Sequence, residues 1–250
     1  MRIDLNSDLG EGFGPWTMGD DAAILDIVTS ANVACGGHAG DPEVMFRTLV
    51  AARERGVVVG AHPGYADPMG FGRRVIPMEP AEIGRMVAAQ VGSLQGIARL
   101  AGVRVAYVKP HGALGNLAAA DRAVASEIAR VAEVLGLPLL AISGTMLDRV
   151  AQEAGVEVHP EVFADRAYLP DGQLVPRARA GAVIHDAEDA AARLVAFLRT
   201  GEMPCLDGGT VRLAARSVCV HSDSPGAVAM AREIRARLAA EGVTVGPFLG

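Results

Sequence analysis

Histidine recurs in this chain close behind short apolar runs, in most cases near glycine. Four histidines occupy such positions, namely His38, His62, His111 and His221. The first apolar run adds three polar side chains at alternate positions, Asp4, Asn6 and Asp8. Imidazole together with carboxylate can hold a divalent metal ion, and it can equally donate and accept protons during catalysis. Neither HxH nor HExxH occurs, so the spacing leaves both chemistries open, with Asp8, His38 and His62 as candidate metal ligands.

Lys109 is the only lysine among the 23 Lys and Arg residues of the chain. GC-rich coding accounts for such a bias toward arginine. The bias also makes the remaining lysine informative, because arginine cannot replace a compact ammonium group or one whose pKa has to move. Lys109 lies between an apolar run and His111. We predict that it acts in the same site as the histidines.

Glycine and arginine offer a further kind of binding chemistry. The stretch Gly70-Phe71-Gly72-Arg73-Arg74 can bind an anion through backbone amides and guanidinium groups, although a surface turn has the same composition. Arg166, Arg177 and Arg179 add positive charge to an otherwise acidic chain. Together they favour a carboxylate or phosphate ligand. Neither a P-loop nor a GxSxG nucleophile elbow is present.

Most of the apolar runs that precede these residues, such as Val57 to Ala61 and Val105 to Val108, do not alternate with polar positions. Such runs are typical of strands buried on both faces, as in a parallel sheet. They predict strands over residues 2–6, 31–35, 57–61, 104–108, 138–142, 156–160 and 217–221. Between them, apolar residues at helical spacing predict helices that begin at Asp41-Pro42-Glu43 and at Glu79-Pro80, and helices over about 120–135, 145–154, 187–199 and 225–240.

Alternation of strands and helices favours one parallel sheet. An open sheet concentrates its site at one switch point, whereas a closed barrel gathers polar residues from the carboxyl ends of many strands. Because such residues follow at least five of the predicted strands, we predict a single β/α-barrel domain over residues 1–250. The segment near 164–183 departs from this rhythm. Asp171-Gly172 predicts a two-residue hairpin turn there, and such a hairpin would either cover the barrel mouth as a lid or form a surface for a partner.

Composition excludes several classes of protein. The net charge of -6 argues against nucleic-acid binding, which requires clustered basic charge. No apolar run is long enough to span a bilayer, and no signal-peptide pattern is present. Three cysteines without CxxC spacing do not form a disulfide framework. These features predict a cytoplasmic protein.

Taken together, the motifs resemble those of the LamB/YcsF family, the A subunit of bacterial ATP-dependent 5-oxoprolinase. The resemblance runs from Ile3 to Asp223, essentially the whole chain. The matching blocks are Asp4-Leu5-Asn6-Ser7-Asp8-Leu9-Gly10-Glu11-Gly12, Asn32 to Pro42 around Cys35-Gly36-Gly37-His38, Gly60-Ala61-His62-Pro63-Gly64-Tyr65, Gly70 to Arg74, Val108-Lys109-Pro110-His111-Gly112, and Glu161 to Tyr168.

The resemblance implies a distorted seven-stranded parallel β/α barrel of the TIM-like type, similar to the barrels of glycoside hydrolases and polysaccharide deacetylases. It also implies an ATP-binding hydrolase that cleaves 5-oxo-L-proline to L-glutamate and releases ADP and phosphate, with Mg²⁺ as the companion of ATP. Two further proteins, subunits B and C, are implied as partners. ATP is needed because a five-membered lactam is a stable amide. Phosphorylation of its oxygen would create a carbon that water can attack.

The same resemblance suggests residue roles. We expect Asp4, Asp8, His62, Lys109 and His111 to be catalytic. Lys109, helped by Arg73, would stabilise phosphoryl or oxyanion charge. His111 or His62 would activate water, oriented by Asp8 or Asp4. Binding of substrate or phosphate is expected of Asn6, His38, Arg73, Arg166 and His221, with Arg166 on the substrate carboxylate.

Two other functions remain open at this point. One is a metal-dependent amide hydrolase or deacetylase that acts alone, with Asp4 or Asp8, His38 and His62 at its centre. The other is a non-catalytic subunit that only binds a lactam. The many titratable groups at the strand ends argue against pure binding, because a sensor needs few of them.

Overall fold

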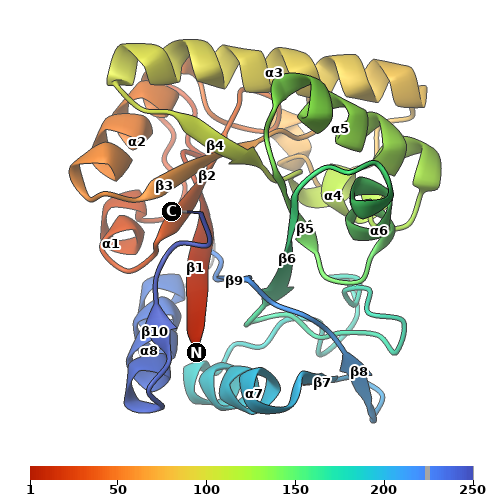
Figure 1. Cartoon of the computed structure of the whole chain (residues 1–250). Coiled ribbons are helices and arrows are strands. Elements are labelled where there is room, and N and C mark those ends of the chain that lie inside the picture. The colour runs from red at the N-terminus through yellow and green to blue at the C-terminus, as the bar shows by residue number, and fades with distance from the viewer. Residues whose placement is uncertain (223–225, 250) are drawn as a thin grey trace.

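Seven parallel strands close into a barrel within residues 1–222 and 226–249, which the computed structural model describes (Figure 1). The strands are β1 (Arg2–Leu9), β2 (Ser30–Ala34), β3 (Val58–His62), β4 (Val105–Val108), β5 (Leu139–Ile142), β6 (Val158–Phe163) and β9 (Ser217–Cys219). They pair in that order, and β9 pairs with both β6 and β1, which closes the ring. The predicted closed barrel is therefore confirmed.

Helices surround the barrel (Figure 1). They are α1 (Asp21–Leu25), α2 (Pro42–Glu54), α3 (Pro80–Ala101), α4 (Gly112–Ala118), α5 (Arg122–Leu135), α6 (Met146–Glu153), α7 (Ala187–Thr200) and α8 (Ala227–Ala240). The predicted start of the last helix at 225 lies outside the described residues. The short helices α1 and α4 were not predicted. Glycines at positions 112 and 115 of α4 hide its helical pattern.

The ends of the long helices follow local chemistry. Asp41 caps α2 by accepting hydrogen bonds from the amides of Glu43 and Val44. Glu79 and Glu82 form a reciprocal capping box at the start of α3. This helix ends at Gly102, whose φ of 69° is a left-handed conformation that favours glycine. Both predicted helix starts are thus confirmed.

β6 lies further along the chain than predicted. The expected range was 156–160, but the strand runs from Val158 to Phe163. Its second half, Glu161 to Phe163, pairs with Ser217 to Cys219 of β9. The predicted range stops at Pro160, a residue that rarely lies inside a strand, and the following Glu161 is a carboxylate that needs a partner from elsewhere in the fold to be buried.

Three short strands were not predicted. β10 (Thr244–Val245) pairs with Arg2 and Ile3 of β1. β7 (Glu202–Pro204) and β8 (Thr210–Arg212) form an antiparallel pair, so the glycine-rich stretch around Gly208 is the turn between them.

The barrel wall is uneven around β4. The register between β3 and β4 shifts at Val59 and Gly60, where a Cβ on Gly60 would lie 2.2 Å from the Tyr107 ring. Only glycine fits there. On its other side, β4 shares with β5 only the register pair Val108–Leu139 among the described residues, whereas β2 and β3 pair along their whole length.

The segment 164–183 is a loop that follows the carboxyl end of β6. Isolated antiparallel bridges join Arg166 to Val183 and Tyr168 to Leu174. The predicted two-residue turn at Asp171-Gly172 is wrong. The Leu169 amide donates to the Gln173 carbonyl, so the loop has three residues, with Pro170 at its first position and Gly172 at a φ of 84°. Proline is pre-organised for the first position of a type I turn, which moves the turn by one residue.

Candidate active site

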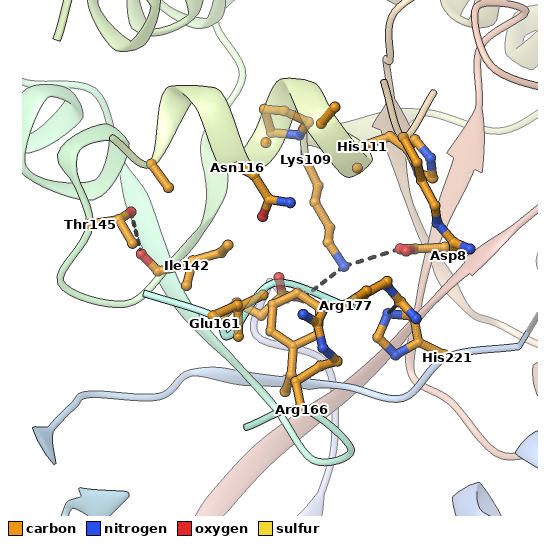
Figure 2. A pocket seen from close by; sticks show the side chains of 18 of the residues that line it. Asp8, Lys109, His111, Asn116, Ile142, Thr145, Glu161, Arg166, Arg177 and His221 are labelled. Carbon is orange, nitrogen blue, oxygen red and sulfur yellow. Dashed lines mark hydrogen bonds and ion pairs between the residues drawn. The ribbon is translucent and has the colours of Figure 1, made fainter. Parts of the chain in front are cut away.

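A cavity of about 620 Å³ opens at the carboxyl ends of the barrel strands (Figure 2). One wall comes from the 164–183 segment, through Arg166, Leu169 and residues 173–178. Seven residues selected from the sequence line the cavity: Asp8, His62, Arg73, Lys109, His111, Arg166 and His221. In the described part of the chain, Asp4, Asn6 and His38 are not among its lining residues.

Lys109 reaches from the end of β4 into the middle of the site, toward Asp8 and Glu161 (Figure 2). Its Nζ lies 3.0 Å from Asp8 Oδ1 and 2.9 Å from Glu161 Oε1. Burial alone would lower the pKa of the ammonium. Asp8, the Cys219 sulfur and Glu161 outweigh it and hold that pKa well above its ordinary value. Lys109 is therefore a cation that lines the cavity.

Glu161 is a member of this group that sequence reasoning missed. Its side chain is almost fully buried, and burial raises its pKa, against the opposing effect of the Lys109 charge. Asn6 Nδ2 donates to Glu161 Oε1 over 2.8 Å. The available signal was its place as the first residue of the block Glu161 to Tyr168, which resembles a known family.

The interior of the barrel is polar and layered along β1. Side chains at alternate positions of a strand point to one face, so Asp4, Asn6 and Asp8 all face inward. Asp8 is at the cavity. Asn6 lies one layer deeper, where it accepts from Asn32 Nδ2 at 2.7 Å and from Lys109 Nζ at 3.1 Å. Asp4 is deeper still, and accepts from the hydroxyls of Thr29 and Ser30 at 2.6 Å and from Ser217.

Asp4 should make the folded state less stable as pH rises. Burial raises the pKa of its carboxyl to about 6, although the hydroxyl groups of Ser217, Ser30 and Thr29 favour its charged form. The folded protein then keeps a proton that the unfolded chain releases. This stabilising contribution is complete below the unfolded pKa of 3.8 and is lost as pH rises through the folded value of about 6.

We expect the free energy of unfolding of the wild type to fall by about 1 kcal/mol between about pH 5 and pH 8 through the titration of Asp4. This decrease should be absent in Asp4→Asn. Thermal or urea unfolding of both proteins at the two pH values measures the difference. Parallel pH dependence in the two proteins would contradict the assignment.

Three imidazoles pack together next to Lys109. His62 Nδ1 donates to the Lys109 carbonyl at 2.7 Å, and His111 Nε2 donates to the Phe71 carbonyl at 2.8 Å. The remaining nitrogens, His62 Nε2 and His111 Nδ1, lie 3.0 Å apart. His38 stacks on His111 with ring centroids 3.5 Å apart. Burial, reinforced by the neighbouring histidines, lowers the pKa of His111 to about 3 and that of His38 well below its ordinary value.

Two carboxylates flank the imidazoles. Asp8 Oδ2 lies 3.3 Å from His62 Nε2, so Asp8 and not Asp4 is placed to orient this histidine. Burial alone would raise the pKa of Asp8, but His62 and Lys109 hold it well below its ordinary value. Glu11 Oε1 lies 3.0 Å from His38 Nε2 and 3.4 Å from His111 Nδ1. Glu11 belongs to a motif noted in the sequence but was not selected as a site residue.

A metal ion would find a different set of ligands from the one expected. Among the described residues, coordinating atoms of Glu11, His38, His62 and His111 lie within 4.8 Å of one another. The expected candidates His38 and His62 are in this set. Asp8 is outside it and contacts it through His62.

On the side of the 164–183 segment, His221 joins a carboxylate to an arginine. His221 Nδ1 donates to Asp165 Oδ2 at 2.6 Å, and its Nε2 accepts from Arg177 at 2.8 Å. Arg166 is oriented differently from expectation, because its Nε and Nη2 donate to the carbonyls of Ala182 and Val175. Arg166 thus links the two ends of the 164–183 segment. Arg177, which is exposed and lines the cavity, is the guanidinium better placed to meet a ligand.

Comparison with known proteins gives a consistent result. The model of the LamB/YcsF family matches residues 3–250. The A subunit of 5-oxoprolinase from Nocardia farcinica is 56% identical over 100% of both chains. The structure of a lactam utilization protein from Thermus thermophilus is 41% identical, with a TM-score of 0.93 over 98% of this chain and 99% of that one.

A more distant likeness concerns the fold alone. The polysaccharide deacetylase Bc1974 from Bacillus cereus is 14% identical, with a TM-score of 0.50 over 98% of this chain and 91% of that one. The expected similarity to deacetylase-type barrels is confirmed at the level of architecture.

Proposed function

Because this chain belongs to the LamB/YcsF family, we propose that it is the A subunit of an ATP-dependent 5-oxoprolinase. The complex would convert 5-oxo-L-proline, ATP and water to L-glutamate, ADP and phosphate, with Mg²⁺ bound to ATP and with subunits B and C as partners. The name of the Nocardia farcinica relative supports this proposal. The observation that carries it is the buried Lys109 ammonium, held between Asp8 and Glu161 beside a group of histidines.

The chemistry requires positive charge at the amide oxygen. Attack of water on the phosphorylated lactam pushes electrons onto the ring nitrogen, which takes up a proton, while the phosphoryl group beside the carbon keeps its negative charge. Lys109 would stabilise that charge, with Arg73 at the cavity wall as a second donor. His62 or His111 would activate the attacking water, and Asp8, 3.3 Å from His62 Nε2, would stabilise the positive charge that forms on the imidazole. Collapse of the adduct breaks the C–N bond and opens the ring to an acyl phosphate, which a second water molecule hydrolyses to glutamate and phosphate.

The substrate carboxylate needs a cation of its own. Arg177 lines the cavity from the lid segment, and its Nη2 contacts His221. We assign carboxylate binding to Arg177 in place of Arg166, whose donors hold backbone carbonyls.

Replacing Arg177 with alanine should raise KM for 5-oxoproline about tenfold or more while kcat changes little, because a hydrogen bond to a charged group contributes roughly 1.5–3 kcal/mol. Steady-state kinetics of the reconstituted complex measures this. Arg179→Ala is the matched control, since Arg179 is an exposed lid arginine paired with Asp207 outside the cavity lining. An unchanged KM in Arg177→Ala would refute the assignment.

The decisive experiment follows glutamate formation from 5-oxoproline by this chain with its two companion subunits, with and without ATP. Glutamate that requires ATP and all three proteins supports the proposal. Glutamate made by this chain alone without ATP would instead establish a stand-alone amide hydrolase. Lactam binding without turnover in any combination would establish a binding subunit.

The cellular setting proposed for this activity is the cytoplasm, where ATP is available. Cys35, Cys205 and Cys219 are free and buried thiols, as a reducing compartment favours. No helix in the described ranges has the length and apolar character needed to cross a membrane.

A further inference from the structure

Four coordinating side chains meet beside the cavity, and three of them also line it; the four are Glu11, His38, His62 and His111. We propose that they form a binding site for one divalent transition-metal ion of the zinc type. The four come from the loop after β1, the loop after β2, the end of β3 and the residue before α4, so the barrel brings them together. All four residues are at most 5% exposed.

The hydrogen bonds of two imidazoles determine which nitrogens face the site. A backbone carbonyl only accepts, so His62 Nδ1 and His111 Nε2, at 2.7 Å and 2.8 Å from carbonyl oxygens, carry the ring protons. In the neutral rings, His62 Nε2 and His111 Nδ1 then present lone pairs. Metal-binding histidines are held in this way, with the distal N–H donated to a carbonyl or carboxylate.

These lone pairs point at each other across 3.0 Å. Two acceptors at that distance repel unless a positive species lies between them. The Glu11 carboxylate is close to the same point, with Oε1 3.4 Å from His111 Nδ1 and 3.0 Å from His38 Nε2. A single added proton would bridge one pair of these atoms. A metal ion accepts electron pairs from all four.

The spacing and the donor types fit such an ion. Ligands about 2.0–2.1 Å from a tetrahedral zinc ion lie about 3.3 Å from one another. The three separations between neighbouring ligand atoms are 3.0, 3.0 and 3.4 Å. Three imidazoles with one carboxylate suit zinc and its neighbours, whereas Mg²⁺ and Ca²⁺ prefer oxygen ligands. This site is therefore separate from any Mg²⁺ that accompanies ATP.

A metal here would change how water is activated in the proposed reaction. The ion would occupy the lone pairs of His62 and His111, and would supply Lewis acidity at the cavity wall. Asp8, whose Oδ2 is 3.3 Å from His62 Nε2, would then be the nearest carboxylate able to receive a proton. The existence of the site does not depend on the reaction, so metal binding can be tested without turnover.

The test is metal binding to the full-length, tag-free chain after treatment with a chelator. Zn²⁺ or Co²⁺ is added, the protein is freed of unbound ion, and metal content is measured by elemental analysis. We expect about one ion per chain, intense visible absorption of four-coordinate Co²⁺, and a rise in Tm with Zn²⁺. Glu11→Gln and His38→Gln should each weaken binding by roughly 100-fold or more, since even indirect contacts to a metal matter 10- to 100-fold.

His159→Gln is the matched control, because His159 is a partly buried histidine that pairs with Glu157 away from this cluster. It should bind metal as the wild type does. Circular dichroism of each variant without metal separates loss of binding from loss of fold, and either variant that folds suffices. Absence of bound metal in the wild type at micromolar Zn²⁺, or equal binding in Glu11→Gln, His38→Gln and His159→Gln, would overturn the proposal in favour of a proton shared between His62 and His111.

Discussion

Replacing Lys109 with methionine should reduce ATP-driven glutamate formation by the reconstituted complex by roughly 1,000-fold or more. One preorganised donor to a developing oxyanion contributes about 100- to 1,000-fold, and Lys109 is a full charge held 3.0 Å from Asp8 and 2.9 Å from Glu161. Arginine is not an adequate replacement, because its planar fork cannot occupy the position of a compact ammonium. The measurement is kcat in the presence of ATP and both companion subunits.

This substitution also affects folding, so a second variant is needed. Removing one partner from a buried ion group costs about 3–5 kcal/mol, and Lys109→Met leaves Asp8 and Glu161 without their shared cation. Adding Glu161→Gln removes one of the two carboxylates and keeps an acceptor for Asn6 Nδ2. The double variant should recover most of the stability but none of the activity. A stable double variant that turns over normally would end the role proposed for Lys109.

The second large effect is expected for Asp8→Asn. Glutamate formation should fall by roughly 100- to 10,000-fold, because the carboxylate that stabilises the protonated imidazole, or receives the proton, is lost. The fold should tolerate the change. Asn retains an acceptor for Lys109 and Asn32, which both donate to Asp8 Oδ1, and the Lys109–Glu161 pair remains balanced. Stability within about 1 kcal/mol of the wild type is expected, by denaturant titration.

Asp4→Asn provides the matched comparison. It is the same substitution on the same strand, at a position deeper in the barrel than Asp8. The Asp4 carboxylate contacts the hydroxyl groups of Thr29, Ser30 and Ser217. We expect this variant to retain most of its activity. Equal losses of glutamate formation in Asp4→Asn and Asp8→Asn would contradict the different roles proposed for the two carboxylates.

The parallel barrel was predictable because its strands are buried on both faces. Such strands are encoded by continuous apolar runs, and a helix start such as Asp41-Pro42 is encoded locally by capping chemistry. The predicted range of β6 was wrong because the position of this strand depends on a contact with a distant part of the chain. Glu161 is stabilised by Lys109, more than fifty positions earlier in the chain, and no local pattern reports such a partner.

The sequence predicted which residues lie together in the site better than it predicted which side chains contact one another. Strand ends meet at one end of a barrel, which correctly placed His62, Lys109 and His111 together. Depth was harder to predict. Asp4 and Asp8 share a face, but about 13 Å of strand separates them, at about 3.3 Å per residue. The orientation of Arg166 was unpredictable, because the lid carbonyls that it binds are fixed only by the folded loop.

The uneven wall around β4 has a dynamic consequence. Where one register pair, Val108–Leu139, joins β4 to β5 in the described ranges, few ladder hydrogen bonds hold the two strands together. Lys109 follows directly on one side of this seam, and Ala141 and Ile142 line the cavity on the other. A small outward displacement of β5 would widen the cavity at Lys109 while the longer ladders stay closed. Backbone amides along this seam should therefore exchange with solvent sooner than those between β2 and β3, giving the barrel a preferred place to open for a ligand.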